Sequence, residues 1–262
     1  MQRKRGDRAM YEDLKNKVVV VTGGGKGIGS IYVSAFGRAG SRVVAADIDI
    51  EAARGIADEV GDDGGSVIAR KVDVADQSSV AHLMRETADV FGGIDVLINN
   101  ASLMSVLPRR SWIDIPFDEW ERVMAVNVQG VFLCCLEGFP YMRERGRGKI
   151  VNISSNRVLD GTPNRLHYTT SKAAVIGFTR ALAREVGEYK INVNAVTPGL
   201  TLSETQVASS EPAYLEAITE KRCIKRNQVP EDLVGTVMFL SSSASDFISG
   251  QTINVDGGQV MH

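Results

Sequence analysis

Cysteine and histidine are scarce in this chain of 262 residues, which contains three of each. Cys134, Cys135 and Cys223 form no CxxC pair, and the histidines are isolated from one another and from the cysteines. An odd number of cysteines without such spacing is typical of reduced thiols rather than of a disulfide framework. Since a zinc site would need a cluster of such ligands, we expect no metal.

An excess of charge of one sign is also missing, because 30 basic and 32 acidic residues leave a formal net charge of -2. This balance provides no overall attraction to nucleic acid or to an anionic membrane, and we expect neither as a partner. Residues 1–16 are rich in basic side chains but lack the apolar run of a signal peptide or membrane anchor. They are predicted to form a flexible basic tail on a cytoplasmic protein.

The chain does contain many short apolar runs rich in valine and isoleucine, which alternate with amphipathic stretches of helical period. The runs predicted as strands are 18–21, 42–46, 66–72, 94–98, 149–153, 191–196 and 252–255. The stretches predicted as helices are 29–39, 51–60, 78–91, 117–145, 168–187 and 231–241, the third with Asp76 as its N-cap. Strands that are apolar on both faces indicate a parallel sheet covered by helices on both sides.

This alternation predicts an α/β fold of the doubly wound, Rossmann-like type, with a seven-stranded parallel sheet and helices on both faces. Residues 17–262 are predicted to form a single domain of this kind. The segment from about 200 to 229 breaks the rhythm, since it is long, mixed in polarity and weakly helical. We predict that it forms a lid over a binding site.

A glycine-rich segment, TGGGKGIG at residues 22–29, follows the first strand and opens directly into a helix. Glycines let the backbone approach a pyrophosphate, and the helix N-terminus offers unpaired N–H groups and a positive dipole end. Asp47 ends the second strand, where a carboxylate can accept the ribose hydroxyls of a bound dinucleotide. Asp73 and Val74, at the end of the third strand, are predicted to flank the adenine.

Three motifs occur in a specific order: GxxxGxG at Gly23, Gly27 and Gly29, then Asn99-Asn100-Ala101, then Tyr168 and Lys172 four residues apart. With these motifs, residues 15–258 resemble the short-chain dehydrogenases/reductases. The resemblance implies transfer of a hydride between a nicotinamide cofactor and an alcohol or carbonyl compound. It also implies further cofactor contacts at Lys26, Ile28, Asn100, Ala101, Tyr168, Lys172, Pro198, Gly199, Thr201 and Ser203. Two positions depart from the family's common pattern: Ser203 stands in place of a threonine, and Ser102 in place of a glycine.

The predicted catalytic group is Asn127, Ser155, Tyr168 and Lys172. Tyr168 and Lys172 share one face of a helix, so a lysine ammonium can lower the phenol pKa from its usual value of about 10. Ser155 lies thirteen residues before Tyr168, and strand alternation points the neighbouring Ser154 the other way. The resemblance gives Ser155 the substrate oxygen, and it makes Asn127 the partner of Lys172 in relaying a proton outward.

The cofactor is predicted to be NAD. The alternative is an NADPH-dependent 3-oxoacyl-[acyl-carrier-protein] reductase, since Lys26 can contact a 2′-phosphate. Against it, two like charges 4 Å apart repel by about 1 kcal/mol in water and about 4 kcal/mol at a dielectric near 20, so Asp47 disfavours that phosphate. A non-catalytic dinucleotide-binding protein is a second alternative, but such a protein is expected to lose at least one catalytic position, and this chain keeps all four.

The residues predicted to contact substrate are Met104, Ser155, Asn156, His167, Tyr168 and Leu200, beside apolar neighbours at Leu103, Val106, Leu159 and Leu202. Arg157 and Arg165 could bind an anionic substrate, but arginines in a loop are more often solvated or at a subunit contact. With that interpretation, the pocket predicts a small neutral secondary alcohol or ketone, cyclic or aryl. Within the family, Asn156 and the sequence around it resemble NAD-dependent secondary-alcohol dehydrogenases of the pyridoxal 4-dehydrogenase and 1-phenylethanol dehydrogenase kind. The apolar helices around Cys134 and after Tyr168 predict a homotetramer.

Overall fold

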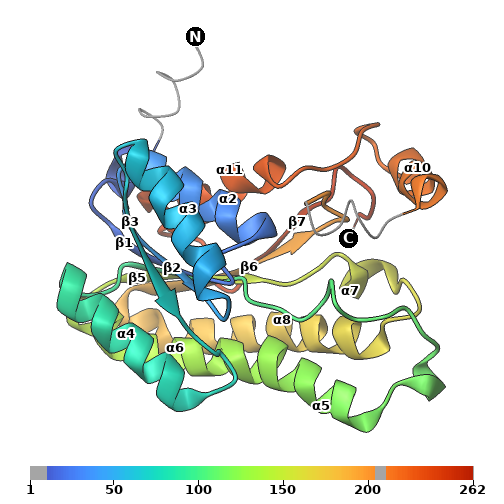
Figure 1. The fold of residues 1–262 in the computed structure, drawn as a ribbon, viewed down its shortest axis with the longest axis horizontal. Helices are drawn as coiled ribbons and strands as arrows, with labels where there is room; N and C mark the ends of the chain where they lie inside the picture. Colours follow the sequence, from blue (N-terminus) through green and yellow to red (C-terminus); the bar gives the residue numbers. More distant parts are fainter. Residues whose placement is uncertain (1–10, 204–210, 262) are drawn as a thin grey trace.

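The computed structural model describes residues 11–203 and 211–261, which form one sheet with helices on both faces (Figure 1). The strands are β1 (Val18–Thr22), β2 (Arg42–Asp47), β3 (Ser66–Lys71), β4 (Val96–Asn99), β5 (Gly148–Ile153), β6 (Ile191–Pro198) and β7 (Thr252–Val255). All pairings are parallel, in the order β3-β2-β1-β4-β5-β6-β7. The predicted fold class and all seven strands are confirmed, with ends shifted by one or two residues.

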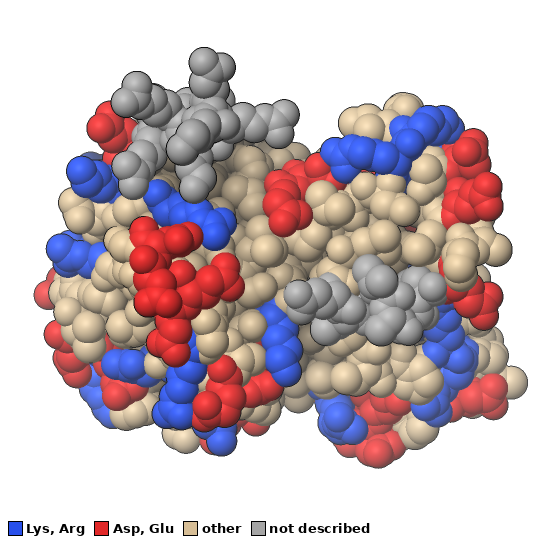
Figure 2. Space-filling view, turned by 45° about the horizontal axis from the view of Figure 1, so that its top comes forward, with Lys and Arg blue, Asp and Glu red and all other residues tan. Residues whose placement is uncertain are grey.

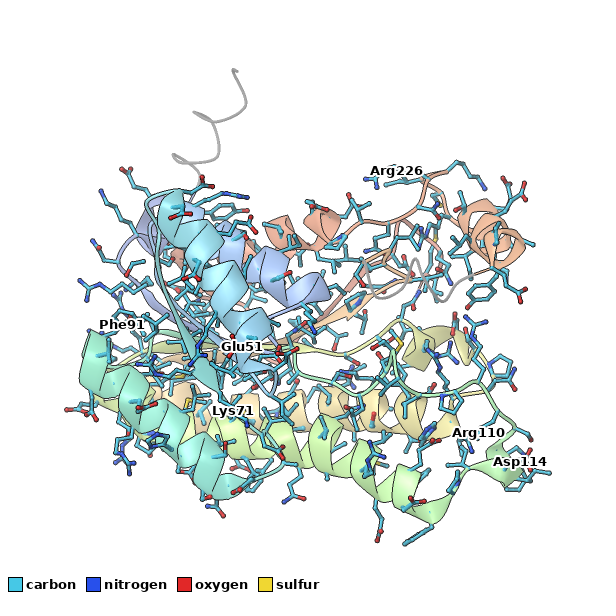
Figure 3. The ribbon with its side chains drawn as sticks, in the orientation of Figure 1. Glu51, Lys71, Phe91, Arg110, Asp114 and Arg226 are labelled. Carbon is cyan, nitrogen blue, oxygen red and sulfur yellow. The ribbon has the colours of Figure 1, made fainter. Side chains whose placement is uncertain are left out.

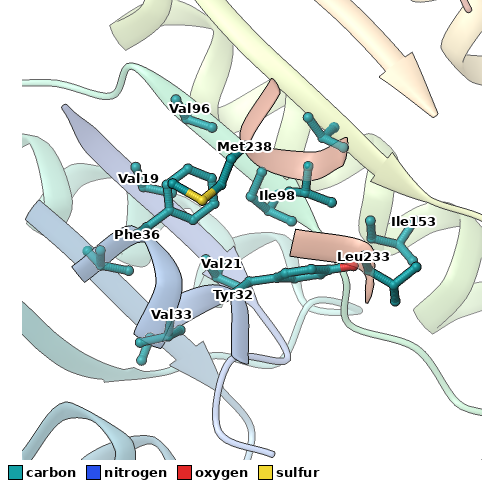
Figure 4. Close-up of a cluster of buried hydrophobic side chains, with 14 of the residues drawn as sticks. Val19, Val21, Tyr32, Val33, Phe36, Val96, Ile98, Ile153, Leu233 and Met238 are labelled. Atoms are coloured by element: carbon teal, nitrogen blue, oxygen red, sulfur yellow. The ribbon is translucent and has the colours of Figure 1, made fainter. Parts of the chain in front are cut away.

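One face of the sheet is covered by α2 (Gly27–Arg38), α3 (Ile50–Asp62) and α11 (Glu231–Ser241). The opposite face is covered by α4 (Gln77–Phe91), α6 (Gly130–Glu144) and α8 (Leu166–Val186). Strand alternation feeds both layers, because Val19 and Val21 join the first core while Val20 joins the second. Figure 4 shows the first core, where Phe36 and Met238 from two helices pack over Val19.

The predicted helix 117–145 is interrupted in its middle. It consists of α5 (Phe117–Met124), a π-helical turn, η3 (Ala125–Gln129), and α6. By length and hydropathy, Phe117–Glu144 is the single run in the described parts of the chain that could span a membrane. Here it packs on α4, α8 and strands β4 and β5, which are the contacts of a core helix.

Short helices complete the described structure and include elements that the sequence patterns did not predict. They are η1 (Glu12–Leu14), η2 (Trp112–Asp114), α7 (Arg157–Asp160), η4 (Gly187–Tyr189), α10 (Pro212–Lys221) and η5 (Ser243–Ser245). The predicted lid contains α10, and its residues 204–210 lie outside the described part. The helix α4 begins behind Asp76, whose carboxylate accepts from the N–H groups of Ser78 and Ser79, as predicted.

The prediction of a flexible tail over residues 1–16 is wrong for residues 11–16, and residues 1–10 lie outside the described structure. Leu14 is 1% exposed and belongs to the first core. Asp13 accepts a hydrogen bond from the N–H of Ser243 at 2.6 Å, and the carbonyl of Leu14 accepts one from Ser41 at 2.8 Å. An apolar side chain buried against the sheet therefore fixes this segment, which a count of its charges does not reveal.

Candidate active site

A cavity of about 520 Å³ opens at the carboxyl edge of the sheet. It lies beside the end of β1, whose neighbours in the sheet are β2 on one side and β4 on the other. Such a switch point is where doubly wound sheets bind their ligands. Segments after β1, β2, β4, β5 and β6 line the cavity, together with α8 and α10. The residues that the sequence assigned to cofactor, catalysis and substrate therefore come together in one place, with the exceptions given below.

The glycine-rich loop has a backbone that larger residues would disturb. Gly23 and Gly27 have φ angles of +62° and +59°, in the left-handed region that favours glycine. A Cβ on Gly29 would lie 1.9 Å from the carbonyl oxygen of Gly23. Gly29 therefore shapes the loop rather than lining the cavity, which corrects its predicted direct contact with the cofactor.

The loop ends at the N-terminus of α2, where no side chain caps the first N–H groups. Gly23, Lys26, Gly27 and Ile28 line the cavity there. Neighbouring atoms leave little room for a Cβ at several glycines of this loop, and the amides at the start of α2 have no side-chain cap. Such a loop can hold a pyrophosphate group against the helix N-terminus. These residues therefore fit the phosphates of a dinucleotide.

Asp47 supports the same loop and also faces the cavity. Its two carboxylate oxygens accept hydrogen bonds from the N–H of Gly25 at 2.9 Å and of Asp49 at 3.0 Å. Lys26 does not point freely into the site, because its ammonium lies 2.6 Å from Asp49 in an exposed ion pair. Asp73 and Val74 line the same end of the cavity, as predicted. This end carries three carboxylates and one lysine, which is already paired.

Asn100 and Ala101 both line the cavity, and they also lock the first loop to the strand after it. The amide of Asn100 donates to the carbonyls of Thr22 and Gly23 at 3.1 and 3.0 Å. The hydroxyl of Thr22 accepts from the N–H groups of Asn100 and Ala101. Thr22 is a supporting residue that the sequence reading passed over, although it directly precedes the glycines.

Tyr168, Ser155 and Lys172 meet at the middle of the cavity. Tyr168 is 6% exposed, and its phenol shares a hydrogen bond with the Ser155 hydroxyl. Lys172 donates from Nζ to the carbonyl of Ile153 at 2.8 Å, and Nζ lies 5.7 Å from the centre of the Tyr168 ring. Ser154 donates instead to the carbonyl of Lys172, as the alternation of the strand predicted for the two serines.

The electrostatics of Tyr168 differ from the prediction. Burial raises the pKa of its phenol above the usual value, while the hydrogen bond from Ser155 and the charges of Arg157 and Arg165 oppose that rise. Burial also lowers the pKa of Lys172 to about 7, so its charge is only partly present at neutral pH. Two arginines are therefore the cations that oppose the rise in the phenol pKa here, while Lys172 lies beside the ring with a partial charge, and its predicted effect on the phenol stays a prediction.

Asn127 lies in the π-helical turn, fully buried behind the cavity. Its side-chain oxygen accepts from the N–H of Leu103 at 2.7 Å, and its amide donates to the Leu103 carbonyl and the Ser171 hydroxyl. Its side chain is thus engaged with the loop after β4 and with α8. The predicted pairing of Asn127 with Lys172 does not occur through these side-chain atoms.

The segment after β6 lines the opposite wall through Pro198, Gly199, Leu200, Thr201 and Ser203. Gly199 leaves no room for a side chain, since a Cβ there would lie 2.7 Å from both Gln228 and Asp256. The hydroxyl of Thr201 donates to the Gly199 carbonyl at 3.1 Å. All five residues, which the sequence assigned to cofactor or substrate contacts, therefore line the cavity.

Among the predicted substrate contacts, Met104, Asn156 and Leu200 line the cavity. His167 does not: it is fully buried, with Nε2 3.1 Å from Glu119 of α5, so this prediction is wrong. Successive residues of a helix point about 100° apart, so the neighbour of Tyr168 faces the adjacent helix. Leu103 and Val106 also line the cavity, whereas the expected Leu159 and Leu202 are not part of its wall.

Three arginines line the cavity close to Tyr168: Arg109, Arg157 and Arg165. Arg157 and Arg165 therefore face the cavity, as the alternative of an anionic substrate would require, and Arg109 joins them there. Tyr214 of α10 lies beside them, with the Arg109 guanidinium 4.3 Å from the centre of its ring. All three arginines are plain in the sequence, but their convergence on the cavity depends on how the loops fold.

The fold and the site define a doubly wound α/β protein with a dinucleotide-binding loop and a buried tyrosine–lysine–serine group. The family model for short chain dehydrogenases matches residues 17–213, and the chain belongs to this family. It is therefore an oxidoreductase of a family that uses nicotinamide cofactors.

Relatives of similar length support the assignment. A probable short-chain type dehydrogenase/reductase of Bradyrhizobium diazoefficiens is 39% identical over 95% of this chain and 89% of its own length. A 3-oxoacyl-[acyl-carrier-protein] reductase of Synechocystis is 36% identical over 95% and 98%. A probable galactose dehydrogenase of Rhizobium meliloti is 34% identical over 95% and 97%. These names differ in substrate, so the family alone leaves the substrate open.

Proposed function

We propose that this protein is an NAD-dependent oxidoreductase that transfers a hydride between the nicotinamide and a small secondary alcohol or its ketone. The main support is the meeting of Tyr168, Ser155 and Lys172 inside the cavity that begins at the α2 N-terminus. A phosphate-binding end and a proton-transferring group in one cavity are what such a reaction needs. Tyr168 is the acid/base in this proposal.

Each side chain has a separate task in the proposed reaction. When bound, the nicotinamide supplies the hydride acceptor for alcohol oxidation. The Ser155 hydroxyl holds the substrate oxygen, and Tyr168, hydrogen-bonded to Ser155, takes the hydroxyl proton as its phenolate and becomes the neutral phenol. Lys172 is held by Ile153 beside the phenol ring, where a partial positive charge favours the phenolate during the transfer.

The choice of NAD over NADP rests on the charges at the adenosine end. Asp47 and Asp49 both line the cavity, and the ammonium of Lys26 is already paired with Asp49. A 2′-phosphate would meet the Asp47 carboxylate without a free cation from Lys26 to offset the repulsion. The structure therefore weakens the main argument for NADP, which was an unpaired Lys26.

A second candidate is an NADPH-dependent 3-oxoacyl-[acyl-carrier-protein] reductase, favoured by the 36% identity to the Synechocystis protein of that name. The two candidates differ in nucleotide and in the size of the substrate. Rates with NADH and NADPH on acetoacetyl thioesters and on simple ketones therefore separate them. Faster reduction of thioesters with NADPH would replace our proposal with this one.

The direct test is a screen of the purified protein with NAD⁺ against secondary alcohols and sugars, together with the Tyr168→Phe variant. The variant is expected to lose at least about a hundredfold in kcat while still binding NADH, because phenylalanine fills the same space but cannot transfer a proton. Tyr189→Phe is the control, since Tyr189 packs against Phe139 away from the cavity. Near-native kcat in Tyr168→Phe would remove this residue from the mechanism, and turnover of no alcohol or ketone would refute the proposed activity.

A further inference from the structure

The two ends of the cavity carry opposite charge. The end near the glycine-rich loop is lined by Asp47, Asp49 and Asp73 beside Lys26, whereas the end beyond Tyr168 is lined by Arg109, Arg157 and Arg165 beside Asp160. In Figure 3, Glu51 marks the start of α3 near the first end and Arg110 marks the loop near the second, and they lie in different parts of the molecule. On the face seen in Figure 2, acidic and basic side chains are interspersed.

The arginines reach the cavity from three separate segments. Arg109 lies in the loop after β4, Arg157 is the first residue of α7, and Arg165 directly precedes α8. Both Arg157 and Arg165 are half-buried, and both border the site of Tyr168 closely enough that their charges act on its phenol. Their guanidinium groups therefore surround the place where a substrate must sit to reach Tyr168.

Neutral groups, rather than carboxylates, hold these guanidinium groups. Arg157 donates to the carbonyls of Thr162 and Pro163 at 2.7 and 2.8 Å. Arg165 donates to the carbonyl of Leu107 at 3.0 Å and contacts the sulfur of Met104. Within residues 11–203 and 211–261, no ion pair links Arg109, Arg157 or Arg165 to a carboxylate.

Asp160, the acidic residue at the same end of the cavity, forms no ion pair with these arginines in the described structure, although its charge acts on Arg157. Asp160 lines the cavity, but one of its oxygens accepts from the N–H and the hydroxyl of Thr162 at 2.8 and 2.6 Å. Its other oxygen accepts from the amide of Gln259 at 3.4 Å. The carboxylate is thus used to form a turn at the rim of the cavity.

Two of these arginines also have buried hydrogen-bond donors that are not used. The Nε atoms of Arg157 and Arg165 are buried and have no hydrogen-bond acceptor in the described structure. A buried N–H without a partner is costly, and a guanidinium can give two parallel hydrogen bonds to one oxoanion. Burial lowers the pKa values of Arg157 and Arg165, repulsion from Arg109 adds to the effect, and an anion between them would relieve that repulsion.

From this arrangement we infer that the substrate carries an oxoanion, a carboxylate or a phosphate, which Arg157 and Arg165 bind with help from Arg109. The inference rests on the proposed function and specifies its substrate class as hydroxy acids and oxo acids, or their phosphate analogues. It replaces the neutral substrate predicted from the sequence, whose premise was that no arginine faces the pocket. The ring of Tyr214 supports Arg109 by stacking on its guanidinium.

The test compares substrates that differ only in charge. Initial rates with NAD⁺ are measured on 3-hydroxybutanoate, lactate and mandelate against their methyl esters, and on glycerol 3-phosphate against glycerol. The acids or the phosphate are expected to have a kcat/KM at least about tenfold above their neutral partners, as a charged hydrogen bond contributes. The two arms separate carboxylate from phosphate. Equal or faster turnover of the neutral partners would overturn the inference and leave the proposed function intact.

Substitutions locate the effect. Arg157→Met and Arg165→Met remove the charge but keep a long side chain, and each is expected to lower kcat/KM for the anion by about tenfold to a hundredfold while changing the ester much less. Arg54→Met, at an exposed pair with Glu51 on α3, is the control. An equal loss for acid and ester would show that the arginines act on the phenol of Tyr168, and it would overturn the inference.

A binding measurement does not depend on turnover. Calorimetric titration of the wild-type protein with NAD⁺ present is expected to detect butanoate or inorganic phosphate, and butanamide only at least about tenfold more weakly. Binding of the anion without any turnover would refute the proposed activity but support the anion site. Butanamide binding as tightly as both anions would overturn the anion site, even if the arginine variants failed to fold.

Discussion

Replacing Asp47 with asparagine separates the charge of this residue from its shape. The carboxylate accepts from the N–H groups of Gly25 and Asp49 at 2.9 and 3.0 Å. An asparagine of the same size keeps one oxygen but turns an NH₂ group toward the second N–H. The loop therefore loses one charged hydrogen bond, and binding of both NAD and NADP is expected to weaken.

The ratio of kcat/KM with NADP to kcat/KM with NAD is the quantity that tests the role of the Asp47 charge. A carboxylate about 4 Å from a 2′-phosphate repels it by about 1 kcal/mol in water and about 4 kcal/mol at a dielectric near 20. Removing that charge is expected to raise kcat/KM for NADP relative to NAD by roughly fivefold to a thousandfold. The weaker loop affects both nucleotides alike and cancels in the ratio.

The assay measures initial rates with each nucleotide at a fixed concentration of the best substrate, for wild type, Asp47→Asn and Asp58→Asn. Asp58 is exposed on α3 and does not line the cavity, so its variant controls for loss of a surface charge. A ratio in Asp47→Asn within about twofold of wild type, below the smallest effect calculated above, would refute the assignment of cofactor choice to this carboxylate.

Three further outcomes test other parts of the structure. Gly29→Ala is expected to lose about 3 kcal/mol or more of stability and most nucleotide binding, because its Cβ would lie 1.9 Å from the Gly23 oxygen. Urea unfolding measures the stability and NADH fluorescence measures the binding, and a urea midpoint equal to that of the wild type would contradict the loop geometry. Burial lowers the pKa of Lys172 to about 7, so between pH 7 and about 10.5 the unfolded chain binds more protons than the folded protein, and the lysine destabilises the fold. The Lys172→Met variant should therefore raise Tm more at pH 7 than at pH 10, and an equal rise in Tm at both pH values would count against this pKa. Exposed Phe132 and Leu136 on α6 support the predicted homotetramer, which light scattering of a monomer at micromolar concentration would exclude.

The sequence predicted those parts of the fold and site that depend on local pattern. Period and apolar content were enough for all seven strands and for the order of the main helices. The glycine-rich loop and the spacing of Tyr168 and Lys172 led to a site whose residues the structure brings together.

The sequence reading failed where a position depends on packing between distant segments. The direction of the His167 side chain depends on how α8 is rotated about its axis, because His167 points toward Glu119 when Tyr168 faces the cavity. In the π-helical turn, the amide of Asn127 bonds to two segments that are far apart in the chain, which no local pattern predicts. Arg157 and Arg165 line the cavity because of the way α7 and the loop after β4 fold around the site. No periodicity in the sequence predicts that arrangement.

Asn127 divides the cavity wall into a part that is fixed and a part that is open to change. Its amide ties Leu103, in the loop after β4, to Ser171, one helical turn beyond Tyr168. The first residues of that loop are therefore held in register with the proton-transferring helix. Beyond that tie, Leu107 packs with Tyr168 and Val123, whereas Ser105, Val106 and Arg109 are exposed and line the cavity. New substrate preferences can thus arise at these three positions while the packing around the phenol is kept.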